Sequence, residues 1–254
     1  MRYEIEVVLE QGPRRAMEDS NVVNKRDGRL FVGVFDGHSV QDGNGHEVAK
    51  LLAEQSPDEY FRRLASTGSP TKAFQETFEV FGKALEGRVP GSTALMLSLK
   101  GRSLIFAHAG DSRLIVVTVD GAIPLTEDHT VDRADELERV QASGANTDQG
   151  CIIVPITGDE KVFVRNSRSF GDCLFREHGV IHTAETGWRN LGRQDLWLIA
   201  ATDGLYTHVG NQSIGTMIRF CQSARQAGEV LVNRVFSQEQ GKDNLTAVII
   251  RLIW

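Results

Sequence analysis

Cysteine is scarce in this chain of 254 residues, which contains three, at positions 151, 173 and 221. They lie far apart, and no Cys-x-x-Cys pair or zinc-ligand spacing occurs. A disulfide framework and a cysteine-based zinc site are therefore not expected, and a reducing compartment is favoured. On this basis we predict a cytoplasmic protein, with the nucleus as the alternative compartment.

Long apolar runs are also missing from the sequence. A membrane-spanning helix needs about 20 consecutive apolar residues, and no stretch approaches that length. Residues 1–12 contain a short apolar run without the basic start of a secretory signal. We therefore expect neither a membrane segment nor a secreted protein.

Dense clusters of basic residues are absent as well. The formal net charge is −6, and Arg14-Arg15 and Lys25-Arg26 are isolated basic pairs. Nucleic acids and anionic membranes are bound by broad positive patches. Neither is therefore expected as a partner, and we predict that the protein acts as a monomer.

Short strand-like segments and amphipathic helical segments fill the chain. β-branched and aromatic runs bounded by turns predict strands at 3–9, 21–24, 30–35, 93–99, 103–109, 113–119, 151–156, 161–165, 196–201 and 245–253. Helical spacing predicts helices at 46–66, with two shorter helices or a kink at Pro57, at 70–85, and at 131–143, 211–222 and 224–238. Blocks of strands between helices favour an α+β fold of antiparallel sheets with helices outside.

Two stretches carry more specific expectations. The strands at 93–119 follow one another with short turns, which predicts an antiparallel meander, and residues 173–193 are expected to be irregular.

Internal repeats, low-complexity tracts and obvious linkers are missing from the sequence. We therefore predict a single domain over residues 1–254.

Four strand-like segments have an acidic residue at one end, namely Asp36, Asp111, Asp203 and Asp243. The clearest, residues 31–38, reads Phe-Val-Gly-Val-Phe-Asp-Gly-His and is typical of a buried strand that ends in an acid. Gly37 would let the backbone turn and bring its own carbonyl close to whatever the acid holds. We therefore expect one site lined with carboxylates.

Converging carboxylates need cations, because an unpaired buried charge is costly. Glu18 and Asp19 are further candidates, and without a cysteine or histidine cluster an all-oxygen site suits Mg²⁺ or Mn²⁺. Two such ions that share a carboxylate can hold a hydroxide for attack on phosphorus. Arg14 could bind the phosphate through its planar fork, and His38 could protonate the leaving oxygen.

Each of these residues has a plainer interpretation when taken alone. Asp-Gly is a common turn dipeptide, and Glu18 and Asp19 are compatible with solvated acids after a loop. Arg14 is compatible with an exposed charge of little effect, and His38 with an ordinary surface histidine. The joint occurrence of these motifs in one chain favours the metal site.

The chain resembles the metal-dependent serine/threonine protein phosphatases of type 2C from Arg14 to Val248. Eight motifs in the family's order carry the resemblance. They are Arg14-Arg15-Ala16-Met17-Glu18-Asp19, Val34-Phe35-Asp36-Gly37-His38, Gly91-Ser92-Thr93-Ala94, Ala109-Gly110-Asp111-Ser112-Arg113, Leu125-Thr126-Glu127-Asp128-His129, Ser167-Arg168-Ser169-Phe170-Gly171-Asp172, Thr202-Asp203-Gly204-Leu205 and Asp243-Asn244-Leu245-Thr246. Each motif alone is weak, but eight in order are specific.

The resemblance implies a central β-sandwich of two antiparallel sheets, flanked by α-helices on both outer faces, with a two-metal site at one end. By position, the resemblance implies that Asp36 bridges both metals, with Glu18 and the Gly37 carbonyl on one metal and Asp203 and Asp243 on the other. Asp111 with Asp203 would bind a weaker third metal. Arg14 would bind the phosphate, His38 would act as general acid, and Asp19 and Asn244 would orient the ligands without binding the metals.

The implied reaction is hydrolysis of phosphoserine and phosphothreonine in phosphorylated proteins by a metal-activated water. The family forms no phosphoenzyme, so the three cysteines need no catalytic role. The main alternative is an inactive phosphatase-like binding or regulatory module, which typically lacks metal ligands that are all present here. A third hypothesis is a phosphatase that acts on small phosphoesters.

The sequence departs from the family pattern in several places. Thr207 stands where a second acid is usual after Asp203, which weakens the case for a third metal. Ser39-Val40 replaces the glycine pair usual after Asp-Gly-His, and residues 155–195, the substrate-side flap in relatives, are divergent. Substrate choice is therefore the feature that the resemblance predicts least.

Overall fold

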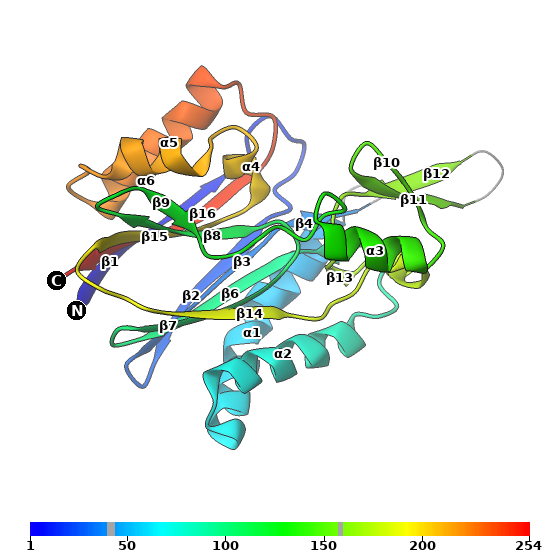
Figure 1. Cartoon of the computed structure of the whole chain (residues 1–254), viewed down its shortest axis with the longest axis horizontal. Helices are drawn as coiled ribbons and strands as arrows, with labels where there is room; N and C mark the ends of the chain where they lie inside the picture. The colour runs from blue at the N-terminus through cyan, green and yellow to red at the C-terminus, as the bar shows by residue number, and fades with distance from the viewer. Residues whose placement is uncertain (40–43, 157–159) are drawn as a thin grey trace.

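Two five-stranded antiparallel sheets form the centre of the computed structural model, which describes residues 1–39, 44–156 and 160–254 (Figure 1). The first sheet contains, in spatial order, β1 (Arg2–Glu10), β16 (Leu245–Ile253), β15 (Asp195–Ala201), β8 (Arg113–Thr118) and β9 (Ala122–Pro124). The second contains β14 (Glu185–Asn190), β7 (Ser103–Ala109), β6 (Ala94–Lys100), β3 (Arg29–Phe35) and β2 (Ser20–Arg26). Neighbouring strands in both sheets pair antiparallel.

Apolar side chains from the facing sides of the two sheets form the central core. On β3, Leu30, Val32 and Val34 alternate with Phe31 and Phe35, and all five are at most 1% exposed. Successive strand residues point to opposite faces. The three aliphatic residues accordingly pack with buried residues of β8, β15 and β16, whereas the two phenylalanines pack with helices.

Helices cover the outer faces of both sheets. α1 (Gly45–Thr67) and α2 (Pro70–Ala84) pack on the second sheet, and α5 (Asn211–Ile218) and α6 (Ala224–Asn233) pack on the first (Figure 1). The order helix, sheet, sheet, helix confirms the predicted α+β sandwich with helices on both outer faces.

Smaller elements gather at one end of the sandwich, toward the right of Figure 1. β4 (Gly37–His38), β5 (Gly91–Ser92) and β13 (Phe170–Gly171) form one three-stranded sheet, and β10 (Asn146–Asp148), β11 (Cys151–Pro155) and β12 (Lys161–Val164) form another. α3 (Ala134–Ala142) and a 3-10 helix at Cys173–His178 pack with the latter around a separate apolar core. A short helix, α4 (Asp203–Tyr206), follows β15, and a π-helical turn at Arg234–Gln238 follows α6.

The predicted meander over residues 93–119 is wrong in its last strand. β6 and β7 pair with each other, but β8 pairs with β15, so residues 110–112 carry the chain from the second sheet to the first. Gly110 makes this turn with a φ of +111°, which side-chain-bearing residues rarely adopt. Residues 114–117 are all 0% exposed, as expected of a strand covered on both faces.

The segment predicted at 46–66 forms one continuous helix, so of the two outcomes expected at Pro57, two shorter helices or a kink, the division into two helices is wrong. Proline inside a helix removes a hydrogen bond and crowds the preceding turn, at a cost of about 3 kcal/mol. Pro57 is itself buried, and Ala53, Tyr60 and Phe61 around it belong to the core against the second sheet. Tertiary packing therefore outweighs the local preference.

The segment 173–193, expected to be irregular, contains β14. This strand pairs with β7 from Glu185 opposite His108 to Asn190 opposite Ser103. Its side chains show no clear alternation, and that of Trp188 is 74% exposed at the edge of the sheet. Backbone pairing rather than side-chain burial therefore determines this strand, which is why its sequence does not indicate it.

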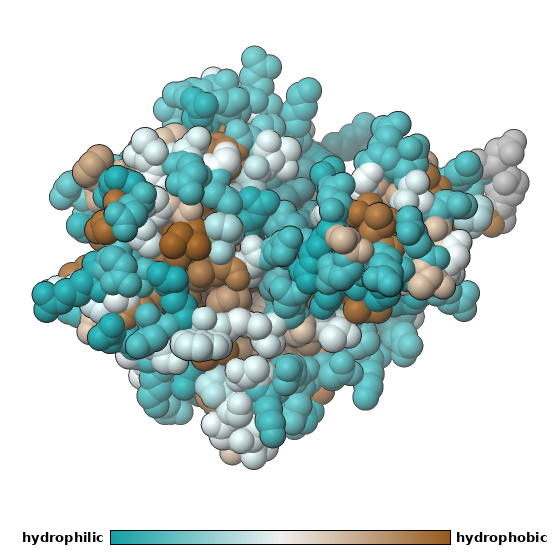
Figure 2. Space-filling view, in the orientation of Figure 1, coloured by the Kyte–Doolittle hydropathy of each residue, from teal (hydrophilic) through white to brown (hydrophobic). Residues whose placement is uncertain are grey.

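Figure 2 shows a mainly hydrophilic face on which hydrophobic residues form small separate groups. Scattered apolar side chains of this kind are ordinary on protein surfaces. Among the described residues, no helix is both long enough and apolar enough to cross a membrane.

Leu198 tests the core between the sheets. It is 0% exposed in the central strand β15, and we expect Leu198→Ala to lower the free energy of unfolding by about 2–5 kcal/mol. Urea unfolding followed by circular dichroism measures this loss. Ile123→Ala on β9, where the side chain is 44% exposed, is the control and should cost less than about 1 kcal/mol. Equal losses would contradict the placement of the core.

Candidate functional site

A pocket of about 250 Å³ lies where strands of both sheets begin or end. β3, β7 and β15 end at this edge, and β8 and β16 begin there, because neighbouring strands run antiparallel. The lining residues are Arg14, Glu18, Asp36, Gly37, His38, Ser39, Asp111, Phe163, Val164, Arg165, Asn166, Asp203, Asp243 and Asn244. They include every residue predicted for the site except Asp19, although the roles assigned to them stay predictions.

Asp36 follows the last residue of β3 and faces other acids. Its N–H donates to Thr93 Oγ1 at 3.2 Å, and its carbonyl accepts from the Thr93 N–H at 2.9 Å. Burial of the carboxyl group raises the pKa of Asp36 well above its usual value, and the charges of Asp19 and Asp203 raise it further. The backbone of Asp36 is thus held in place while its negative charge is left unbalanced.

Asp203 and Asp19 lie on the side of the first sheet. Asp203 begins α4, and burial followed by the charge of Asp243 raises its pKa. Asp19 lies behind the pocket wall, where it is 6% exposed and accepts a hydrogen bond from Thr202 Oγ1 at 2.9 Å. Burial raises the pKa of Asp19 to about 7. Asp19 therefore adjoins the lining acids without lining the pocket itself.

Glu18 and Gly37 meet in a close backbone contact. A Cβ atom at Gly37 would lie 2.5 Å from the Glu18 carbonyl oxygen and 2.4 Å from that of Gly45, so no larger residue fits. The Gly45 N–H donates to Glu18 Oε1 at 3.1 Å, and the Glu18 N–H donates to Asn244 Oδ1 at 2.8 Å. These contacts fix the place of the Glu18 carboxylate beside the Gly37 backbone.

The segment that contains Arg14 is tied to the start of β16. Arg14 Nη2 lies 2.7 Å from Asp243 Oδ2, and Arg14 Nε donates to the Lys242 carbonyl at 3.1 Å. Asn244 Nδ2 donates to the Ala16 carbonyl at 3.0 Å. The Arg14 side chain is 53% exposed, so its ion pair adds little stability but keeps the guanidinium at the pocket.

His38 contacts Asp172, a partner that the sequence did not indicate. His38 Nε2 lies 2.7 Å from Asp172 Oδ2, and Ser169 Oγ donates to the same oxygen at 2.5 Å. Asp172 is buried and has a left-handed φ of +52°, which is uncommon outside glycine. Burial by itself lowers the pKa of His38, but the Asp172 carboxylate raises it above its usual value. The Ser167–Asp172 motif was visible, but nothing in its spacing connects it to His38.

Asp111 lies in the turn that carries the chain between the sheets. With its amide nitrogen turned toward Asp111, Asn166 donates to the two carboxylate oxygens at 2.7 and 3.0 Å. Burial raises the pKa of Asp111 to about 8, and the charge of Asp203 contributes. Asn166 was not predicted from the sequence. Thr207, which replaces an acid usual in the family, is exposed and does not line the pocket.

The donor set of the pocket fits hard divalent cations. Among the described residues that line it there is no cysteine, and oxygen donors predominate. The pKa values of Asp36, Asp111 and Asp203 are all raised, because burial and facing negative charges disfavour the ionised forms. Mg²⁺ and Mn²⁺ prefer carboxylate, carbonyl and water oxygens. These residues could therefore hold such ions, whose charge would offset the repulsion.

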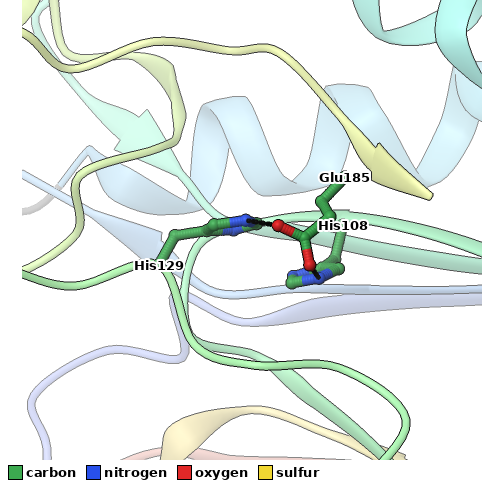
Figure 3. A group of neighbouring side chains, drawn as sticks. All are labelled: His108, His129 and Glu185. Atoms are coloured by element: carbon green, nitrogen blue, oxygen red, sulfur yellow. Dashed lines mark hydrogen bonds and ion pairs between the residues drawn. The ribbon is translucent and has the colours of Figure 1, made fainter. Parts of the chain in front are cut away.

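A second group of potential ligands lies outside the pocket lining. One ligand atom each from His108, His129 and Glu185 lies within 4.8 Å of the others (Figure 3). The three come from β7, from the chain after β9, and from β14, so no sequence spacing indicates the group. Two histidines and a carboxylate are a ligand set that zinc accepts by composition.

The raised pKa values make the stability of the metal-free protein depend on pH. The pKa of Asp111 is about 8 and that of Asp19 about 7, whereas unfolded aspartate ionises near 4. The folded state therefore binds more protons than the unfolded state, and stability falls as the pH rises through these values. In EDTA we expect a loss of about 1.4 kcal/mol per pH unit for each extra proton that the folded state holds, from about pH 5 up to about pH 7 for Asp19 and about pH 8 for Asp111, with no further loss once these groups have ionised.

Calorimetric measurement of Tm against pH in EDTA checks this expectation. Burial lowers the pKa of His129 to about 4, so this group opposes the loss below about pH 6.5, where an unfolded histidine is protonated, and contributes little above about pH 7.5. Asp111→Asn should reduce the slope and Mn²⁺ should flatten it, whereas Asp120→Asn, in an exposed turn, should leave it unchanged. A Tm independent of pH in EDTA would contradict the charge arrangement.

Comparisons with known proteins agree with this architecture. The family model described as Protein phosphatase 2C matches residues 5–243. "Probable protein phosphatase 2C 52" of Oryza sativa subsp. japonica is 28% identical and is matched over 95% of this chain and 49% of its own length. "Probable protein phosphatase 2C 11" of Arabidopsis thaliana is 29% identical, over 95% of this chain and 64% of its own length. The chain thus spans about half to two thirds of these relatives.

A solved structure shares the fold. The serine-threonine phosphatase 2C from Toxoplasma gondii has a TM-score of 0.72 at 22% identity, over 98% of this chain and 94% of that one. The family match begins in the first strand and ends at Asp243, the last acid that lines the pocket. The chain therefore belongs to the protein phosphatase 2C family.

Proposed function

We propose that this chain is a Mg²⁺- or Mn²⁺-dependent protein phosphatase that hydrolyses phosphoserine and phosphothreonine in proteins without a phosphoenzyme. The observation that carries the proposal is one pocket in which five acids meet Arg14 and His38. Membership of the protein phosphatase 2C family supports it. The three cysteines are not among the lining residues, which agrees with direct attack by water.

Two divalent cations would be held between the sheets, and a third would bind more weakly. We assign Asp36 to both main cations from its position in the family pattern; the surrounding acids, whose charges raise its pKa, are consistent with that place. The remaining assignments are Glu18 and the Gly37 carbonyl to one cation, Asp203 and Asp243 to the other, and Asp111 with Asp203 to the third. Asp19 and Asn244 would support these ligands through Thr202 and the Glu18 backbone.

The cations, when bound, supply an activated water as nucleophile near neutral pH and stabilise the charge of the phosphoryl group. Arg14 would bind phosphate oxygens through its planar guanidinium, which Asp243 keeps at the pocket. His38 would donate a proton to the leaving serine or threonine oxygen. Asp172 favours that role, because its carboxylate raises the pKa of His38 and so favours the protonated ring.

The substrate polypeptide would contact the pocket wall at the end of β12. Phe163, 55% exposed, and Arg165 add an apolar and a basic side chain beside the proposed phosphate site. Both belong to residues 155–195, where the sequence departs from the family pattern. We therefore propose that this wall contributes to substrate choice. In the departure at Ser39-Val40, Ser39 also lines the pocket and Val40 lies outside the described residues.

We further propose that residues 1–254 form one catalytic domain that acts as a monomer in the cytoplasm or nucleus. The continuous core between the two sheets supports a single domain. The low cysteine count supports a reducing compartment.

A metal-depletion assay tests the proposed activity. Protein treated with EDTA and then supplied with Mn²⁺ should regain hydrolysis of a phosphothreonine peptide and show little activity on a phosphotyrosine peptide. Activity confined to small phosphoesters would favour the hypothesis that the protein is a phosphatase of small phosphoesters. Absence of all phosphatase activity would favour the inactive binding module.

Asp36→Asn and Asp203→Asn should abolish activity while the fold persists. Replacing a residue that merely supports a ligand costs about 10- to 100-fold, so loss of a ligand should cost roughly 100-fold or more in kcat/KM. The measurement is phosphopeptide hydrolysis with circular dichroism as the fold check. Asp120→Asn, in an exposed turn, is the matched control and should retain full activity. A wild-type rate in Asp36→Asn would contradict the site assignment.

His38→Ala should slow phosphoserine peptides more than aryl phosphates. A general acid contributes about 10²- to 10⁴-fold, but an aryl leaving group needs little protonation. Asp172→Asn should show the same selectivity to a smaller degree, because it removes the charge that raises the pKa of His38. Comparison of kcat for a phosphoserine peptide and p-nitrophenyl phosphate tests this. Equal losses on the two substrates would remove the role of His38 as proton donor.

A further inference from the structure

His129 lies outside the pocket lining, yet each of its backbone and side-chain polar groups contacts a polar group of a neighbouring residue. Its N–H donates to the Gly110 carbonyl at 3.0 Å, and its Nδ1 accepts from the Gly110 N–H at 3.2 Å. Its carbonyl accepts from the Ser167 N–H at 2.9 Å, and its Nε2 lies 3.3 Å from Glu185 Oε2. The side chain is 0% exposed. Both backbone polar groups of Gly110 are therefore fixed by this one buried residue.

The same segment also holds the chain that follows Asp111. Thr126 Oγ1 accepts from the Leu114 N–H at 2.9 Å. The Asp128 carboxylate accepts from the guanidinium of Arg113 at 3.0 and 2.7 Å. The turn that carries Asp111 from one sheet to the other is thus bound on both sides by the segment that contains His129.

The contacts of His129 indicate a hydrogen-bonded group rather than a metal site (Figure 3). A backbone N–H is always a donor, so Nδ1 of His129 bears the lone pair and Nε2 carries the proton toward Glu185. A metal lies in the plane of each imidazole that binds it. The rings of His108 and His129 stack at 4.3 Å with planes 21° apart, so their planes do not converge on one ion. Arg133 Nη2 already lies 2.7 Å from Glu185 Oε2.

We infer that His129 is a positioning residue, which sets the place of the Asp111 carboxylate by fixing Gly110, while Glu185 and Arg133 hold its ring in the required tautomer. The inference rests on the proposed function, in which Asp111 helps to hold the weakest of the cations. Because burial lowers the pKa of His129 to about 4, the ring keeps its acceptor at Nδ1 near neutral pH.

His129 also reaches Asp111 by a second route. Ser167, whose N–H is bonded to the His129 carbonyl, directly follows Asn166, the residue that donates to both oxygens of Asp111. An isolated β-bridge between Thr130 and Asn166 reinforces this contact. The backbone next to Asp111 and the amide that orients its carboxylate thus both depend on residues 129–130.

Two near-isosteric substitutions test the Nδ1 contact with Gly110 and the Nε2 contact with Glu185 separately. His129→Asn places an amide oxygen near the position of Nδ1, so it keeps the acceptor for Gly110 and loses the contact with Glu185. The longer side chain of His129→Gln reaches toward Glu185, so it keeps that contact and loses the acceptor for Gly110. Asp111→Asn reports the loss of the carboxylate itself. His182→Ala is the matched control, a half-buried histidine that also pairs with a glutamate and does not line the pocket.

Titration of the metal-free protein with Mn²⁺, followed by the electron paramagnetic resonance signal of free Mn²⁺, measures the affinity for each ion. In His129→Gln and Asp111→Asn the weakest ion should bind roughly 10-fold or more weakly, as for other losses of ligand support. His129→Asn should stay within about threefold of wild type, and His182→Ala should match wild type. A general loss of stability, measured in parallel as Tm, does not predict this order.

Adding His129→Gln to Asp111→Asn should cause no further loss, because both act through the same carboxylate. Equal affinities in His129→Asn and His129→Gln, or wild-type affinity in His129→Gln, would overturn the inference and leave the proposed function standing. Wild-type protein that binds no Mn²⁺ would contradict the proposed function, and the inference with it.

Discussion

Repulsion among carboxylates gathered at one end of the sandwich is the constraint on which the site depends. The pKa values of Asp19, Asp36, Asp111 and Asp203 are all raised by burial and by the charges of neighbouring acids. Several of their nearest partners are neutral hydroxyls and amides, such as that of Thr202 on Asp19. These groups orient the acids without neutralising them. A bound cation would therefore relieve the repulsion among these carboxylates, and this relief would favour its binding.

The distances between the acids are a property of the whole sandwich. Asp36 and Asp111 follow strands of the second sheet, whereas Asp203 follows β15 and Asp243 precedes β16 in the first. Their separation therefore depends on how closely the two sheets pack, and this is set by a core filled to 0–1% exposure along β3. Close-packed interiors resist small displacements, so the core acts as the rigid frame of the pocket.

Local patterns explain what could be predicted from the sequence. Asp36 and Asp203 were foreseen because a short apolar run followed by Asp-Gly specifies both a strand and the acid at its end. Asp172 was missed because its contact with His38 spans 134 residues and depends on two-residue strands that carry no periodic signal. Similarly, β8 looks like a third meander strand until its partner β15, far along the chain, is known. Such non-local pairings leave no trace in neighbouring residues.

The position of β16 in the first sheet has a consequence for biosynthesis. Although it follows all other strands in the chain, it lies between β1 and β15 and pairs with β1 along nine residues. A nascent chain that has not yet been extended through residues 243–253 lacks both this interior strand and Asp243. Its first strand has no partner, and the cation pocket lacks one wall. Assembly of the pocket is therefore deferred until residues 243–253 have been synthesised and have left the ribosome.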